Sequence, residues 1–482
     1  MLAVAHVLGL LLAISGAAYA LPFVCSLVMG DGFAGVFLIA AAICSGTGLV
    51  LSGATHHFRR ELKPRDGFLL VTLGWVLVSA CAAAPFMMAL PGLSFTKAFF
   101  EAMSGLTTTG STVLSGLDTL PPSIIFWRHS LHWFGGLGII IMGVAILPLL
   151  GVGGMQLYRG ETPGAVKEDR LTPRIMETAK ALWFVYAVMT GVGIVSLRLC
   201  GMSWFDAICH SFSVVGLGGF STHDASIAYF HSPAIEAVLI LLMILASLNF
   251  ARHFVALRRL SRDPYTEDTE AKTILIILAL SVVGIAALLT WRDVYASFST
   301  AFRHSAFNVV SMATTSGLVS QDFGKWPVFA PAWMLFLSCI LCSTGSTGGG
   351  IKMFRTLLLA KQAGREMKLL VHPSAVAPVR IGGRPVPDRV AHSALGFIFL
   401  YFMTVALFTF AMLLTGLDLG SSIGAIVGSI NNTAGGLHAL SPGKTYQTLS
   451  SLQIWICTGA MLLGRLEVFS VLVLFTPAFW RK

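Results

Sequence analysis

The sequence is poor in charged side chains. Only 11% of its 482 residues are Asp, Glu, Lys or Arg, whereas soluble domains carry about 25%. Hydrophobic residues make up 55% of the chain, and the mean hydropathy is +0.80. This composition excludes an ordinary soluble domain. It predicts an all-α integral membrane protein with several spans, because a helix satisfies its own backbone polar groups inside the bilayer.

The sequence also lacks the residue patterns of an enzyme. The apolar stretches show no Ser/His or paired-carboxylate constellation, and no nucleotide-binding fingerprint follows a soluble strand. Cys339 and Cys342 form a CxxC within an apolar run, but no second ligand pair accompanies them, which disfavours a redox or metal site. His210, His223 and His304 have no metal-ligand spacing. We therefore expect no enzymatic activity and no cofactor bound by this chain.

The apolar regions follow a repeating pattern. After an N-terminal pair of helices, one unit recurs four times: a long apolar helix, a short helix, a loop of small polar residues and a second long helix. At 1.5 Å per residue the long helices can cross a bilayer and the short ones cannot. The sequence therefore predicts about ten spanning helices and four re-entrant half-helices around one central pore.

The boundaries of these predicted elements follow from the hydrophobic runs. The N-terminal pair covers about 2–29 and 33–54; it lacks the basic start of a signal peptide, so we expect a retained first helix. The long helices of the four units cover 67–90 and 124–150, 181–200 and 234–257, 273–290 and 331–359, and 390–415 and 452–477. The half-helices cover 95–106, 204–215, 296–313 and 421–430. The resulting divisions are 1–65, 66–158, 159–260, 261–365 and 366–482.

The distribution of positive charge sets the expected orientation. This topology places both termini and the connections between units on one side, and that side holds 24 of the 32 Lys and Arg residues. Cytoplasmic loops carry an excess of such residues. We therefore predict cytoplasmic termini, and the net charge of +10 reflects membrane orientation rather than binding of nucleic acid.

The four polar loops are the candidate ion site. The first is Thr107-Thr108-Thr109-Gly110-Ser111, and we expect Gly110, Gly219 and Gly317 to adopt positive φ. The C-terminal end of each half-helix carries about half a negative charge, which favours a cation. The loops offer carbonyls and hydroxyls rather than carboxylates, which suits a large monovalent ion. The alternative is that small residues only allow close helix packing, but four matching loops favour an ion site.

Several segments resemble the Trk/Ktr/HKT potassium uptake superfamily, specifically the pore subunits of its bacterial Trk branch. These segments are 99–113, 147–167, 171–183, 211–224, 307–317, 342–352 and the Asn431-Asn432 pair. The resemblance covers essentially the whole chain and implies one K+ selectivity filter made of four loops. The residues that it places at the ion are Thr108, Thr109 and Gly110; Leu217, Gly218 and Gly219; Thr315, Ser316 and Gly317; and Asn432, Thr433, Ala434 and Gly435.

The fourth loop departs from the family pattern. When the Asn pair is aligned, the filter glycine of the family falls on Ala434, and Gly435 replaces a usual proline. Two registers remain open: Ala434 occupies the place of the glycine, or the loop is shifted by one residue onto Gly435.

The third long inner helix contains a second unusual stretch, residues 343–352. Its glycines, among them Gly345, Gly348, Gly349 and Gly350, interrupt the helix; the alternative is a kink for packing. The resemblance implies a mobile intramembrane loop, ending near Lys352, that closes the pore below the filter.

Arg465 lies within the last apolar helix. A charge inside the membrane usually faces an interior cavity. The alternative is a salt bridge to Glu467, but residues two apart on a helix do not face each other. We therefore predict that Arg465 faces the pore and acts together with the glycine loop.

These features predict K+ uptake across the bacterial inner membrane. The resemblance implies a homodimer with one pore per protomer, and a cytosolic nucleotide-binding regulatory subunit that the basic segments 159–180 and 361–389 could bind. The alternatives are a coupled secondary transporter, such as an H+ or Na+ symporter, and a Na+-permeable member of the same superfamily.

Overall fold

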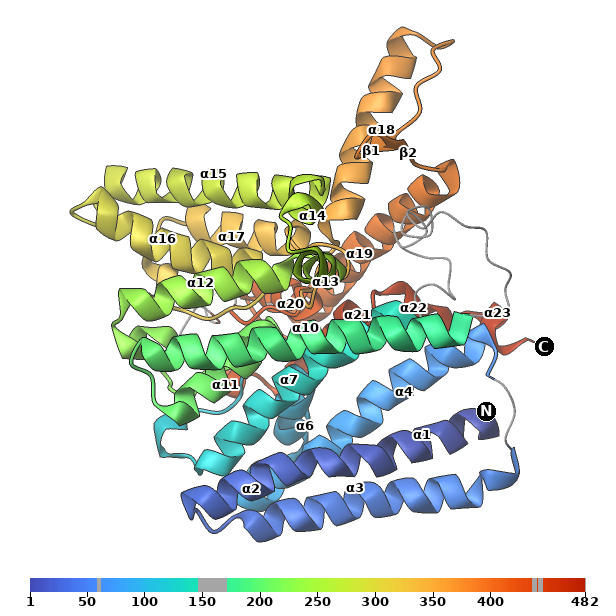
Figure 1. Cartoon of the computed structure of the whole chain (residues 1–482), viewed down its shortest axis with the longest axis vertical. Coiled ribbons are helices and arrows are strands. Elements are labelled where there is room, and N and C mark those ends of the chain that lie inside the picture. The colour runs from blue at the N-terminus through green and yellow to red at the C-terminus, as the bar shows by residue number, and fades with distance from the viewer. Residues whose placement is uncertain (59–61, 146–170, 436–439, 441–444, 482) are drawn as a thin grey trace.

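The computed structural model describes residues 1–58, 62–145, 171–435, 440 and 445–481. These residues form a bundle of helices (Figure 1), which confirms the all-α class. The described strands are β1 (Arg380–Ile381) and β2 (Arg384–Pro385), an antiparallel pair in which Arg380 lies opposite Pro385.

The N-terminal segment packs as two adjacent helical rods. The first consists of α1 (Leu2–Ser15) and α2 (Ala20–Met29), and the second is α3 (Ala34–Ala54). Gly9 and Gly48 lie where the rods meet, and a Cβ at Gly9 would lie 2.8 Å from the carbonyl oxygen of Gly48. Small residues therefore allow the close approach of the two backbones.

In each of the four predicted units the half-helix lies between an outer and an inner helical element. The helices that precede the half-helices are α4 (Pro64–Ala82) with α5 (Ala84–Ala89), α10 (Leu171–Leu199), α15 (Thr269–Trp291) and α19 (Asp388–Leu414). The half-helices are α6 (Phe95–Leu106), α11 (Trp204–Val215), α16 (Phe298–Ala313) and α20 (Leu419–Asn431). The inner helices are α7 (Pro122–Ala145), α12 (Pro233–Ser247), α17 (Phe329–Ile340) and α21 (Ser451–Arg465). The remaining helices are α13 (Phe250–Arg259), α14 (Asp263–Thr266), α18 (Met353–Val371), α22 (Phe469–Leu472) and α23 (Pro477–Trp480).

Six helical stretches in the described residues are long and apolar enough to cross a membrane, or up to eight if each of two bent pairs counts as one span. The predicted inner helix 124–150 corresponds to α7, and residues 146–150 lie outside the described part. The third inner element is α17, which ends at Ile340, before the glycine stretch. The chain is therefore a multi-pass membrane protein.

Two inner helices predicted as straight are bent, so the predictions of single helices over 234–257 and 452–477 were wrong. Helices α12 and α13 meet at 102°, and α21 and the segment Phe469–Phe475 meet at 107°. The side chain of Asn249 accepts a hydrogen bond from the Ala251 amide (2.9 Å) and starts α13 as a new helix. At the second bend Glu467 and Val468 have φ of 55° and 35°, which no right-handed helix can accommodate.

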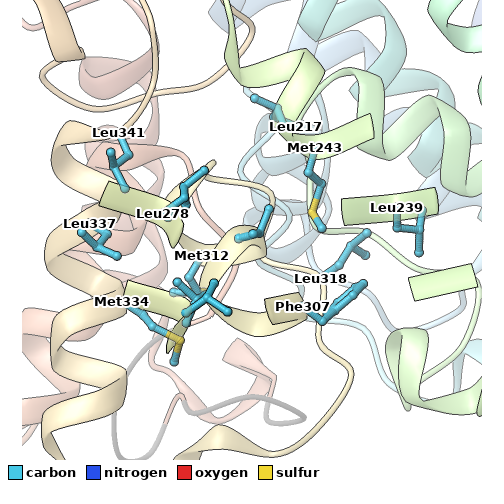
Figure 2. Packing of buried hydrophobic residues seen from close by; sticks show 14 of the residues in the cluster. Leu217, Leu239, Met243, Leu278, Phe307, Met312, Leu318, Met334, Leu337 and Leu341 are labelled. Atoms are coloured by element: carbon cyan, nitrogen blue, oxygen red, sulfur yellow. The ribbon is translucent and has the colours of Figure 1, made fainter. Parts of the chain in front are cut away.

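A large apolar cluster fills the space between the second and third units. Figure 2 shows Leu217, Met243 and Phe307 on different elements of this cluster, and each is fully buried. This cluster packs against α11 and α16 and holds these two half-helices in place. The two chain ends lie on the same side of the bundle (Figure 1), where Arg65 donates a hydrogen bond to the Arg481 carbonyl oxygen at 3.4 Å.

Candidate ion pathway

The four half-helices begin in the same way. At each N-terminus a side-chain oxygen accepts a hydrogen bond from the backbone amide three residues later, which satisfies an otherwise unpaired N–H group. The capping residues are Ser94, Ser203, Ser297 and Asp418. These caps fix where each half-helix starts.

The four half-helices also end in the same backbone turn. One residue adopts the left-handed conformation, and the amide of the next residue donates to the carbonyl oxygen five positions earlier, as in a Schellman motif. The left-handed residues are Thr108, Leu217, Thr315 and Asn432, with φ of 54°, 54°, 66° and 53°. The following amides belong to Thr109, Gly218, Ser316 and Thr433, with N–O distances of 2.8, 2.8, 2.9 and 2.9 Å. Strained backbone of this kind persists where the surrounding structure enforces it, and often marks functional sites.

The residues after these turns converge in the interior of the protein. A Cβ at Gly110 would lie 2.5 Å from the Cα of Gly219, and a Cβ at Gly317 would lie 2.6 Å from the amide nitrogen of Ala434. Ser316 donates to the carbonyl oxygen of Gly218 at 3.3 Å, and Asn432 donates to Thr109 at 3.0 Å. The structure thus brings together all four predicted loops.

The positive φ that was expected of three loop glycines is present at two of them. Gly110 and Gly317 have φ of 79° and 80°, a region that glycine reaches at little cost. Gly219 does not have positive φ, so that expectation was wrong. Space requires a glycine there, because a Cβ would lie 2.7 Å from the carbonyl oxygen of Ser316 and still closer to the Ala434 methyl group.

The backbone identifies the register of the fourth loop. Asn432 is its left-handed residue, so Ala434 stands two positions later, as Gly110 does after Thr108. The Cβ of Ala434 also lies beside Gly110, Gly219 and Gly317. Of the two registers that the sequence left open, the structure therefore has Ala434 in the place of the glycine. Gly435 has positive φ, 97°.

The converging loops present neutral oxygen atoms. Thr109, Ser316 and Thr433 are fully buried and carry hydroxyls. The Thr433 hydroxyl and the Asn432 side-chain oxygen have no hydrogen-bond partner among the described residues. Buried polar atoms are normally satisfied, so unpaired oxygens at this point fit a site for a cation or water.

The glycine-rich segment is a loop directly beneath this point. It runs from Leu341 to Lys352, between α17 and α18. The Gly349 amide donates to the Thr315 hydroxyl at 3.1 Å. A Cβ at Gly349 would lie 1.9 Å from the carbonyl oxygen of Asn431, so only glycine fits there. Gly345 and Gly350 have φ of 82° and 78°. Gly348 accepts a hydrogen bond from the Lys352 ammonium group.

Arg465 binds this intramembrane loop. The guanidinium donates to the Thr347 carbonyl oxygen at 2.8 Å and to the Gly135 carbonyl oxygen at 2.9 Å. Glu467 instead pairs with Arg355 at 2.6 Å, so the alternative of an Arg465–Glu467 salt bridge is not formed. Arg465 is 3% exposed. Arg465 and the glycine loop are therefore in direct contact.

Sequence reasoning missed a buried ion pair beside the first loop. Glu101 lies in α6 and Arg128 in α7, 2.8 Å apart, and both are fully buried. Neither residue was singled out from the sequence. The available signal was the position of Glu101 within an apolar half-helix, seven residues before Thr108.

Among the described residues no group of three or more His, Cys, Asp or Glu side chains could hold a metal ion. All eight cysteines, including Cys339 and Cys342, are free.

Comparisons with known proteins agree with this arrangement. A family model described as "TrkH: Cation transport protein" matches residues 34–482. The Trk system potassium uptake protein TrkH of Halomonas elongata is 44% identical over 480 residues, which cover 99% of this chain and 98% of that protein. Its counterpart from Escherichia coli K12 is 42% identical over 486 residues, covering 100% and 99%.

A solved structure is similar over the same length. The crystal structure of the potassium transporter TrkH from Vibrio parahaemolyticus has a TM-score of 0.92 and 39% sequence identity, and the match covers 100% of this chain and 99% of that one. Because the family consists of transport proteins, this chain is not an enzyme. The chain belongs to the TrkH family of cation transport proteins.

Proposed function

We propose that the protein takes up K+ across the bacterial inner membrane through a selectivity filter formed by the four loops. The observation that carries this proposal is the convergence of four half-helix C-termini with the same backbone turn. Their negative dipole ends favour a cation, and carbonyl and hydroxyl oxygens can replace the hydration shell of a large monovalent ion. The relatives named as potassium uptake proteins support K+ as the substrate.

The gate in this proposal is the intramembrane loop together with Arg465. The loop lies directly below Thr315 and Asn431, and Arg465 binds the Thr347 carbonyl oxygen. A positive charge at this point raises the energy of a passing cation. Movement of Gly345, Gly348, Gly349 and Gly350 away from the loops opens the path, and Lys352 is the hinge at the start of α18.

The proposal also includes the partners that membership of the Trk family implies. A cytosolic nucleotide-binding regulatory subunit controls the gate, both termini face the cytoplasm, and two protomers associate, each with its own pore. The wording "Trk system" in the names of the relatives supports a transporter of several components. Segment 361–389, which includes the C-terminal part of α18 and the β1–β2 hairpin, extends from the bundle (Figure 1) and offers a binding surface. Most of segment 159–180 lies outside the described residues.

Ion flux into liposomes that contain the purified protein tests the proposal, with K+, Rb+ and Na+ compared. We expect K+ and Rb+ to enter faster than Na+. Equal rates for Na+ and K+ would identify a Na+-permeable member of the family, and K+ entry that requires an H+ or Na+ gradient would identify a symporter. No cation flux either from the wild type or from a folded variant that lacks 345–350 would contradict the proposal.

A further inference from the structure

A second repeated position lies behind the four loops. Seven residues before each left-handed residue, the half-helix carries a side chain that is fully buried. The four residues are Glu101, His210, Asn308 and Ala425. Three of them are polar, and buried polar groups require hydrogen-bond partners.

In the first three units these partners lie in the segment that leaves the loop. Glu101 accepts hydrogen bonds from the Val113 amide (3.0 Å) and the Thr112 hydroxyl (2.9 Å). The other two contacts are His210 Nε2 with the Ser221 hydroxyl (2.9 Å) and Asn308 with the Ser320 hydroxyl (3.1 Å) and amide (3.2 Å). Each polar side chain therefore fixes its loop from behind.

In the first and third units the residue four positions before the left-handed residue also bonds to the segment that leaves the loop. Ser104 donates to the Ser111 carbonyl oxygen, and Ser311 donates to the Leu318 carbonyl oxygen, both at 2.6 Å. The equivalent residue in the fourth unit is Gly428, where a Cβ would lie 2.8 Å from the Gly435 carbonyl oxygen. Since Ala425 and Gly428 have no polar side-chain atoms, these two positions hold the fourth loop by packing alone.

Arg128 connects the first two loops to each other. Its guanidinium donates to Glu101 at 2.8 Å, to the Thr112 hydroxyl at 3.2 Å and to the Ser221 carbonyl oxygen at 3.4 Å. It also lies 4.1 Å from the ring centroid of Phe220, the residue after Gly219. One buried cation thus contacts the exits of both loops.

We propose that Glu101 and Arg128 are positioning residues for ion selectivity, which hold the exits of the first and second loops at a fixed separation. This inference rests on the proposed function of the loops as a K+ filter. Replacing a buried ion pair with apolar residues is often neutral for stability, whereas a fully bonded polar network fixes one geometry. The pair therefore acts on the spacing of the loop oxygens more than on the stability of the fold.

The test is the ratio of initial K+ to Na+ flux in proteoliposomes for E101Q and R128K. We expect the ratio to fall about tenfold, which corresponds to roughly 1.4 kcal/mol between the two ions. A loss of folded protein lowers both fluxes equally and leaves the ratio unchanged. If neither single variant is recovered folded, the double variant E101Q/R128M, which has no unpaired buried charge, is measured with the same expectation.

Two controls make the result decisive. E236Q breaks another carboxylate–guanidinium pair, Glu236–Arg303 at 2.7 Å between α12 and α16, and we expect it to keep the wild-type ratio. G110S changes a predicted filter residue itself. An unchanged ratio in the Glu101 and Arg128 variants, with a lowered ratio in G110S, would overturn the positioning role alone. An unchanged ratio in G110S as well would overturn the proposed filter.

Discussion

The four loops and the intramembrane loop differ in how their central residues are held. Each of the four loops closes on its own half-helix through backbone hydrogen bonds over three to five residues, such as Thr109 to Ser104. The intramembrane loop has local bonds too, such as the Ser346 amide to the Ser343 carbonyl oxygen at 3.2 Å, but Thr347 at its centre has distant partners. Arg465 donates to the Thr347 carbonyl oxygen, and the Thr347 hydroxyl donates to the Val215 carbonyl oxygen at 3.1 Å. Local bonds hold a fixed shape, whereas distant bonds can be exchanged when elements move. This difference matches a filter and a gate.

A substitution in one of the four loops is expected to have the largest effect on K+ uptake and selectivity. In G317S an L-residue would adopt left-handed φ, which costs roughly 1–2 kcal/mol, and its Cβ would lie 2.5 Å from the Ala434 methyl group. We expect loss of K+ uptake or loss of the K+ preference over Na+. Flux of both ions in proteoliposomes measures this, and G284S, in the open middle of α15, serves as the control. Wild-type selectivity in G317S would remove the third loop from the filter.

Deletion of 345–350 removes the centre of the intramembrane loop, and we expect it to raise K+ flux rather than abolish it. Removing the loop beneath the four converging turns leaves their local hydrogen bonds intact, so we expect faster K+ flux with an unchanged K+/Na+ ratio. The same liposome assay measures both quantities. A folded deletion variant that transports no faster than wild type would show that the loop does not obstruct the path.

Arg465→Ala is expected to act in the same direction but less strongly. It removes one positive charge and two hydrogen bonds to carbonyl oxygens, those of Thr347 and Gly135, while the rest of the loop remains. We expect increased flux, with Arg465→Lys closer to wild type because it keeps the charge. Equal flux in wild type and both variants would show that Arg465 has no role in the gate.

The sequence predicted much of this arrangement because the strongest signals were local. Half-helices, loop positions and the glycine stretch depend on runs of apolar residues and on small residues, and all appear where they were expected. The bends at Asn249 and Glu467 were missed because the two helices at each bend, taken together, have the length and composition of one span. The role of Gly219 was misread because the space around it depends on Ser316 and Ala434, which lie far away in the sequence.

The Glu101–Arg128 pair was missed for a similar reason. The two residues lie on different helices, and only the folded chain brings them together. The ion-lining and gate roles of the predicted residues, and the division into five segments, stay predictions.

The smallest expected effect concerns Ala434, the one residue that breaks the match among the four loops. Its φ is not positive, so alanine carries no left-handed strain there, and its methyl group lies among three glycines. Ala434→Gly removes that methyl group and restores the residue found in the other loops. We expect a folded protein with preserved or higher K+/Na+ selectivity.

Gly435→Ala separates the two registers. Gly435 has φ of 97°, so alanine costs of order 1–3 kcal/mol in backbone strain, but the nearest atom to a Cβ there is the Met312 sulfur at 3.7 Å, an ordinary contact. We therefore expect a lower melting temperature with a modest change in the flux ratio. If Gly435→Ala abolishes selectivity while Ala434→Gly has no effect, Gly435 holds the place of the filter glycine and the register described above is wrong. Negligible effects of both substitutions on the flux ratio would mean that the fourth loop does not contact the ion, and that three loops select it.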